Sequence, residues 1–127
     1  MTEEDLKLRF KAFALRIIKM VDAMPKTISS LAIAKQIVRS GTSPSANYRA
    51  ACLGKSKKDF LNKLKFVEEE LDETAHWLEL IIDGEILPEQ RVRPLYDECI
   101  ELLKITISSI TSTRKYISTH PQENSER

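Results

Sequence analysis

Apolar residues return every three or four positions along most of this chain, which predicts amphipathic helices. Four such stretches, separated by three short breaks, cover residues 4–23, 27–53, 57–82 and 88–117. The expected core positions of the first stretch are Leu6, Phe10, Phe13, Ile17, Val21 and Met24. Those of the third are Phe60, Leu64, Val67, Leu71, Thr74 or Ala75, Leu78, and Ile81 or Ile82. Those of the fourth are Val92, Leu95, Cys99, Leu102, Leu103, Thr106, Ile110 and Thr113. Short connections make consecutive helices antiparallel, so the pattern predicts an all-α, up-down-up-down four-helix bundle.

The second stretch is the hardest to delimit because Gly41 and Pro44 oppose helix by about 1 and 3 kcal/mol relative to Ala. Its expected core positions are Ile28, Leu31, Ala34, Ile37 and Val38. Local propensity alone favours a break within residues 40–45. We favour a continuous helix with a kink at Pro44, because four packed helices need partners of similar length. In that helix Gly41, Ser45 and Ala46 form a small-residue face that a neighbouring helix can approach closely.

Turn and capping residues mark the ends of these stretches. Pro25 closes the first, and Thr27 is the expected N-cap of the second. Ser56 is the expected N-cap of the third, and Pro88 opens the fourth at a first-turn position. We therefore expect one bundle over residues 1–119, followed by a disordered C-terminal tail over residues 120–127.

Length and composition agree with a single helical domain. A chain of 127 residues with only three Gly and five Pro is long enough for one core and poor in turns. Cys52 and Cys99 lack the spacing of a metal or redox pair, so we expect buried free thiols. The N-terminus lacks the features of a signal peptide, and no apolar run approaches the roughly 20 residues that span a bilayer. A cytoplasmic protein without a membrane partner is expected.

Charge along the chain is strongly polarised, although the net charge is only +1. Residues 35–65 carry eight Lys or Arg and one acid, a local charge of +7. Residues 66–90 carry nine acids and no Lys or Arg, a local charge of −9. The remaining segments contribute about +2 (residues 1–34) and +1 (residues 91–127), which restores the net charge of +1 and conceals this polarity.

Several segments together resemble a family of four-helix bundles encoded in intervening sequences of bacterial 23S ribosomal RNA genes. They are residues 34–43 (AKQIVRSGTS), 46–50 (ANYRA), Asp59-Phe60, Lys63-Leu64 and 69–80 (EELDETAHWLEL), and the likeness extends over residues 5–117. The resemblance implies a small up-down bundle that assembles into a homopentameric ring. A related group serves as accessory proteins to reverse transcriptases in diversity-generating retroelements and binds RNA through a basic surface. This chain departs from the family at Pro44, where an aliphatic residue is usual, and from the retroelement proteins in its near-neutral charge.

The basic stretch is the first candidate site. It contains Arg39, Arg49, Lys55, Lys57, Lys58, Lys63 and Lys65, which are expected near the junction of the second and third helices. Such a group can neutralise phosphates of RNA or another nucleic acid, with Tyr48 as a stacking surface. The alternatives are a merely solvated face, or a contact between copies in which the basic patch of one meets the acids of the next. In that contact the expected interface residues are Glu69, Asp72, Glu73, His76 and Trp77, together with Glu68 and Glu79.

No catalytic constellation accompanies these charges. Glu73 and His76 have the Glu-x-x-His spacing of di-iron bundles, but only one copy is present. The serines lack His and Asp partners, and no Gly-rich phosphate loop occurs. We therefore expect no metal, no cofactor and no enzymatic activity. The expected function is that of a homo-oligomeric bundle, pentameric by resemblance, that associates with nucleic acid. The alternatives are a reverse-transcriptase accessory factor and a scaffold that binds no nucleic acid.

Overall fold

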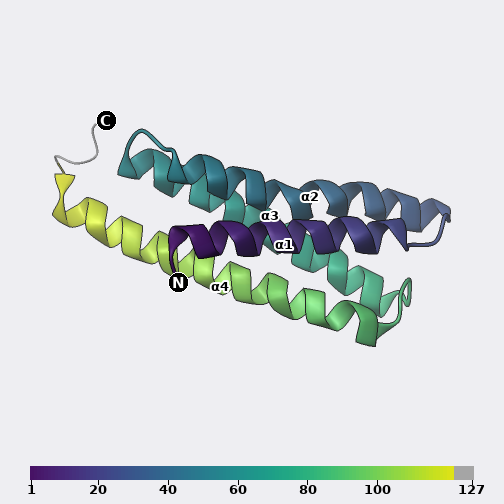
Figure 1. Cartoon of the computed structure of the whole chain (residues 1–127). Helices are drawn as coiled ribbons and strands as arrows, with labels where there is room; N and C mark the ends of the chain where they lie inside the picture. Colours follow the sequence, from purple (N-terminus) through teal and green to yellow (C-terminus); the bar gives the residue numbers. More distant parts are fainter. Residues whose placement is uncertain (122–127) are drawn as a thin grey trace.

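The computed structural model describes residues 1–121 and places four α-helices side by side in an elongated bundle (Figure 1). The helices are α1 (Glu3–Asp22), α2 (Ile28–Cys52), α3 (Lys57–Asp83) and α4 (Glu89–Thr119). Each packs against the next in sequence, and α4 closes the bundle through a smaller contact with α1. The predicted all-α, up-down four-helix bundle is confirmed, with helix ends within two residues of expectation. Within the described part of the chain, no helix is long and apolar enough to cross a bilayer.

The helix α2 runs without interruption through Gly41 and Pro44, which confirms that the second helix is continuous. A Cβ atom at Gly41 would lie 2.8 Å from Cγ1 of Ile17, so the absent side chain lets α1 approach α2 closely. Packing on α1 and α3 therefore outweighs the poor propensity of this stretch. Ser45 is half-buried and Ala46 is exposed, so the close approach is centred on Gly41. The kink at Pro44 stays a prediction.

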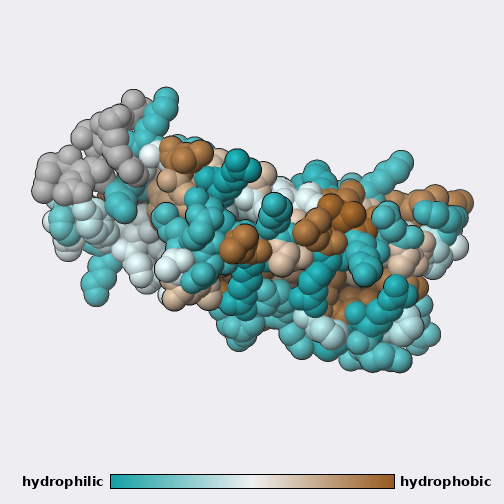
Figure 2. Space-filling model, in the orientation of Figure 1, coloured by the Kyte–Doolittle hydropathy of each residue, from teal (hydrophilic) through white to brown (hydrophobic). Residues whose placement is uncertain are grey.

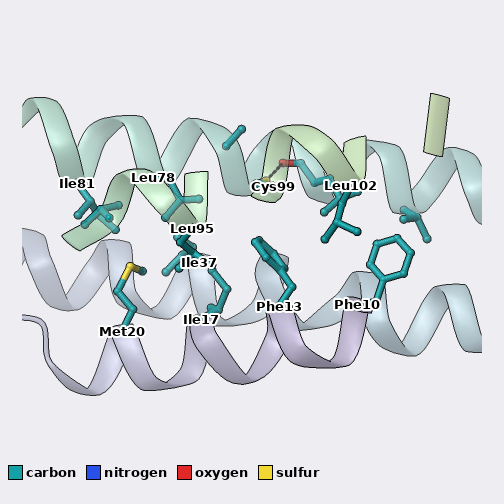
Figure 3. Packing of buried hydrophobic residues seen from close by; sticks show 14 of the residues in the cluster. Phe10, Phe13, Ile17, Met20, Ile37, Leu78, Ile81, Leu95, Cys99 and Leu102 are labelled. Atoms are coloured by element: carbon teal, nitrogen blue, oxygen red, sulfur yellow. Dashed lines mark hydrogen bonds between the residues drawn. The ribbon is translucent and has the colours of Figure 1, made fainter. Parts of the chain in front are cut away.

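The core is a column of aliphatic and aromatic side chains between the four helices (Figure 3). In α1, α3 and α4 nearly all expected core positions are buried; Val21, Phe60 and Leu103 are only partly so. In α2 the expectation was partly wrong, because Ile28 is 93% exposed and Leu31 42% exposed. The buried face of α2 instead consists of Ser30, Ala34, Ile37, Ser40, Gly41, Pro44, Tyr48 and Ala51. These residues share one helical face, but most are too small or too polar to stand out in a hydrophobic pattern.

Side-chain caps begin three of the four helices. The hydroxyl of Thr27 accepts from the backbone N–H of Ser30, and that of Ser56 accepts from the N–H of Asp59, as predicted. Pro88 was expected in the first turn of the fourth helix, but it is the N-cap residue just before α4, and its side chain makes no capping hydrogen bond. Of the predicted C-terminal tail, residues 122–127 lie outside the described part of the chain. His120 directly follows α4, and its ring stacks on Tyr116 with centroids 4.1 Å apart.

Candidate functional site

An ion cluster joins α2 to α3 in the middle of the bundle. Nη1 of Arg39 donates to both carboxylate oxygens of Glu70, at 3.0 and 3.1 Å, and Nη2 binds the carboxylate of Glu73. The indole N–H of Trp77 donates to the same Glu73 carboxylate at 3.0 Å. This bond, followed by the one from Arg39, lowers the pKa of Glu73. Arg39 and Trp77 therefore both bind Glu73 within one chain.

Glu70 is the buried member of this cluster, with 6% of the residue exposed. Beside it, the Thr74 hydroxyl lies 2.7 Å from the Glu70 carbonyl oxygen and 2.9 Å from Oγ of Ser40. Sequence reasoning missed both Glu70 and Ser40 as interior positions. Helical spacing could have predicted that Glu70 is buried. It lies three residues after Val67 and four before Thr74, on the buried face of α3.

The remaining basic residues differ in what they contact. Lys63 binds Asp59 one turn earlier, with Nζ 2.8 Å from Oδ1. Nζ of Lys57 lies 5.1 Å from the ring centroid of Tyr116 and 5.8 Å from that of Phe60, distances typical of cation–π contacts. Lys55, Lys58 and Lys65 are exposed and make no ion pair in the region that the structure describes. They are the available cations of α3 and the loop before it.

Tyr48 does not provide the expected stacking surface, so that expectation was wrong. Only 4% of the residue is exposed, and its ring packs on Phe10 with centroids 5.1 Å apart. Because α2 presents residues 41, 44, 48 and 51 to the core, Tyr48 shares the buried face rather than the basic one.

One exposed stripe of α3 carries both signs of charge. At steps of three and four it presents Lys58, Asn62, Lys65, Glu69, Asp72 and His76, all exposed. Positions with this spacing lie on one helical face, so the stripe is basic in its first half and acidic in its second. Three of the residues expected at an interface, Glu69, Asp72 and His76, thus lie together in its acidic half.

Arg49 lies away from this stripe, in a hollow of about 580 Å³ between α1 and α2. The lining carries Lys7, Lys11 and Arg49 against a single acid, Glu4. Apolar side chains adjoin the hollow along α1: Leu8 is 62% exposed, Leu15 58% and Ile18 42%. Figure 2 shows hydrophobic surface gathered where α1 faces the viewer. This side of the bundle therefore combines positive charge with exposed apolar surface.

The described residues contain no group of three or more His, Cys, Asp or Glu able to hold a metal. Glu73 is engaged by Arg39 and Trp77, whereas His76 is exposed, with its ring 5.1 Å from that of Trp77. Both cysteines are free thiols; Cys99 is buried and Cys52 is partly buried. Burial raises the pKa of the Cys99 thiol to about 12, and its Sγ donates to the carbonyl oxygen of Leu71. A neutral buried thiol of this kind fills space in the core.

Fold and site together define an up-down four-helix bundle with charged and apolar faces on its surface. Residues 4–108 match the model of the 23S rRNA-intervening sequence protein family, and the chain belongs to that family. It is also similar to the crystal structure of a protein of unknown function from the S23 ribosomal protein family of Bacteroides thetaiotaomicron. That comparison gives 34% identity and a TM-score of 0.81, covering 87% of this chain and 99% of the other. A comparison with curated proteins gives no match.

Proposed function

We propose that this protein is a non-enzymatic scaffold whose copies assemble head to tail into a ring. The observation that carries the proposal is the apolar stripe of Leu8, Leu15 and Ile18 on α1, which lies exposed beside a positively charged hollow. Contiguous apolar surface rimmed by charge is typical of a protein–protein interface. A second copy is the proposed occupant, because the same chain carries a complementary surface on α3.

Charge complementarity supports this pairing of faces. The hollow offers Lys11 and Arg49, with Lys7 paired to Glu4 at 3.9 Å, while the acidic half of the α3 stripe offers Glu69 and Asp72. Beside those acids on α3, Phe66 and Leu80 are 42% and 38% exposed and can cover the apolar stripe of α1.

The two faces are different surfaces of one chain, so the contact is heterologous. Such contacts close into a ring when the rotation between copies permits. The resemblance to ring-forming bundles makes five the expected number of copies.

A charge placed in the apolar stripe tests the assembly. We expect Ile18→Asp to dissociate the oligomer, because it replaces apolar surface of the contact by a carboxylate that faces the acidic half of the α3 stripe of the next copy. Ile107→Asp on α4 is a matched control, since Ile107 is 43% exposed and Ile18 42%. Size-exclusion chromatography with light scattering should give the mass of one chain for Ile18→Asp and the wild-type oligomer mass for Ile107→Asp, with equal helicity by circular dichroism. A monomeric wild-type protein at micromolar concentration, or an Ile18→Asp variant of wild-type mass, would refute the proposed interface.

Nucleic-acid binding is a second candidate function, favoured by the exposed Lys55, Lys58 and Lys65, which form no ion pair within residues 1–121. Their ammonium groups are free to displace counterions from a phosphate backbone. Binding to RNA in support of a reverse transcriptase is the narrower form of this candidate. It requires a reverse transcriptase gene and its template repeat beside the gene for this protein.

Reversing two of these charges tests the second candidate. We expect Lys58→Glu with Lys65→Glu to weaken RNA binding at low salt and to reduce the slope of log K against log salt by about 1.4 to 1.8, the loss of two phosphate contacts. Lys26→Glu with Lys35→Glu makes the same charge change elsewhere on the surface and should retain most of the binding. Filter binding or fluorescence anisotropy across a salt series gives both the RNA affinity and its dependence on salt. Equal losses in the two variants would show that only net charge matters, and a wild-type protein that fails to bind would exclude this function.

A further inference from the structure

A second group of cations lies in a groove between α1 and α4, outside the basic stretch seen in the sequence. Arg16 and Lys19 on α1 and Arg91 on α4 line a hollow of about 220 Å³ whose other lining residues are Met20 and Leu95. The two arginines are 75 residues apart along the chain, so only the fold brings them together.

None of the three cations makes an ion pair with any residue that the structure describes. The neighbouring carboxylates of α4 have other partners. Glu98 accepts two bonds from Arg9, at 2.7 and 2.8 Å, and Glu89 binds Arg93 at 3.0 Å. Asp22, three residues after Lys19, forms no ion pair in the described region, but it lines a different hollow, between α1 and α2. The groove therefore concentrates three positive charges, none of which is held in an ion pair within the described part of the chain.

The start of α4 adds to this positive potential. Arg91 stands in the first turn of a 31-residue helix whose N-cap, Pro88, provides no side-chain acceptor. The N-terminal end of a helix carries a partial positive charge and free N–H groups that favour anions. The groove also lies far from Lys55 and Lys58. Those lysines are at the start of α3, whereas Arg91 follows its end, and a helix of 27 residues is about 40 Å long.

We propose that this α1–α4 groove binds a phosphate group. Two guanidinium groups from opposite walls and one ammonium group match the several acceptor oxygens and the charge of a phosphate. Leu95 and Met20, both buried, give the groove an apolar floor that limits competing water. The phosphate can belong to a small phosphorylated molecule or to the 5′ end of a nucleic acid, since both present the same terminal group. This site is distinct from the α3 lysines and from the α1–α2 face, so it does not rest on the proposed function.

Titration of the full-length protein with inorganic phosphate at constant ionic strength, followed by NMR, tests the site. We expect saturable shifts of the side-chain N–H signals of Arg16 and Arg91. Arg16→Gln with Arg91→Gln should weaken phosphate binding by about tenfold or more, because two charge-assisted contacts are lost. Arg114→Gln with Lys115→Gln removes the same charge from the exposed end of α4 and should leave binding within about twofold of wild type. Absence of saturation, or an equal loss in the control variant, would overturn the proposal.

Competition identifies the source of the phosphate. A short RNA with a 5′-phosphate that displaces inorganic phosphate, when the same RNA with a 5′-hydroxyl does not, confirms the site as one for nucleic-acid ends. Saturable phosphate binding that neither RNA displaces confirms it as a site for a small phosphorylated ligand. Lys58→Glu with Lys65→Glu should leave the phosphate titration unchanged in either case, so failure of the proposed nucleic-acid function is distinguishable from failure of this site.

Discussion

Replacing Gly41 by valine is expected to lower the free energy of unfolding by about 3 kcal/mol, because it overpacks the closest approach between α1 and α2. Even a Cβ atom at this position would lie 2.8 and 2.9 Å from Cγ1 and Cγ2 of Ile17. Ile17 has no exposed surface, and its side chain is branched at Cβ, so it cannot rotate out of the contact. Relief requires the two helices to move apart, which loosens the core on both sides of the contact.

Urea denaturation followed by circular dichroism measures this loss. Ala46→Val is the matched control, since Ala46 lies five residues further along α2 and is exposed. Ala46→Val should lower the free energy of unfolding only by the difference in helix propensity between alanine and valine, about 0.5 kcal/mol. Shortening Ile17 to alanine in the Gly41→Val protein should recover part of the lost stability, because it removes the atoms that clash. If Gly41→Val and Ala46→Val unfold at the same urea concentration, the close helix approach at Gly41 is wrong.

Hydrophobic periodicity was sufficient to predict the architecture but not the interior of α2. Leu64, Leu71 and Leu78 recur at seven-residue steps, and a pattern of this length has few helical alternatives. In α2 the interior contains Ser40 and Gly41, whose burial depends on a neighbouring helix that a local pattern does not describe. A search for small residues at helical spacing would have found this face.

The candidate sites were harder to predict, because charge along the chain differs from charge in space. Arg39 was expected to face nucleic acid and Glu73 another subunit, yet they bind each other across 34 residues. Arg16 and Arg91 belong to segments of modest net charge, yet the fold places them around one groove. Pairing between helices depends on their register, which a linear charge count does not contain.

Removing Arg39, the cation of the α2–α3 ion cluster, is also expected to cause a large loss of stability. Arg39→Met leaves the carboxylate of Glu70, only 6% exposed, without the nitrogen that contacts both of its oxygens, and its remaining side-chain contact is Oγ of Ser43 at 3.5 Å. An uncompensated buried charge is strongly destabilising. We expect the midpoint of urea unfolding to fall by about 1 M or more.

The reverse substitution should cost much less, and this asymmetry is the sharper test. Glu70→Met removes the buried charge itself, while Arg39 remains half-exposed and keeps Glu73 as its partner. The double variant Arg39→Met with Glu70→Met should unfold near the midpoint of Glu70→Met, because apolar side chains of similar size can replace a buried ion pair at little cost. Lys63→Met breaks a partly exposed pair within α3, whose side chains are 36% and 33% exposed, and should shift the midpoint by only about 0.3 M. Equal midpoints for Arg39→Met and Lys63→Met would mean that solvent reaches Glu70 freely, and that the cluster contributes no more than a surface ion pair.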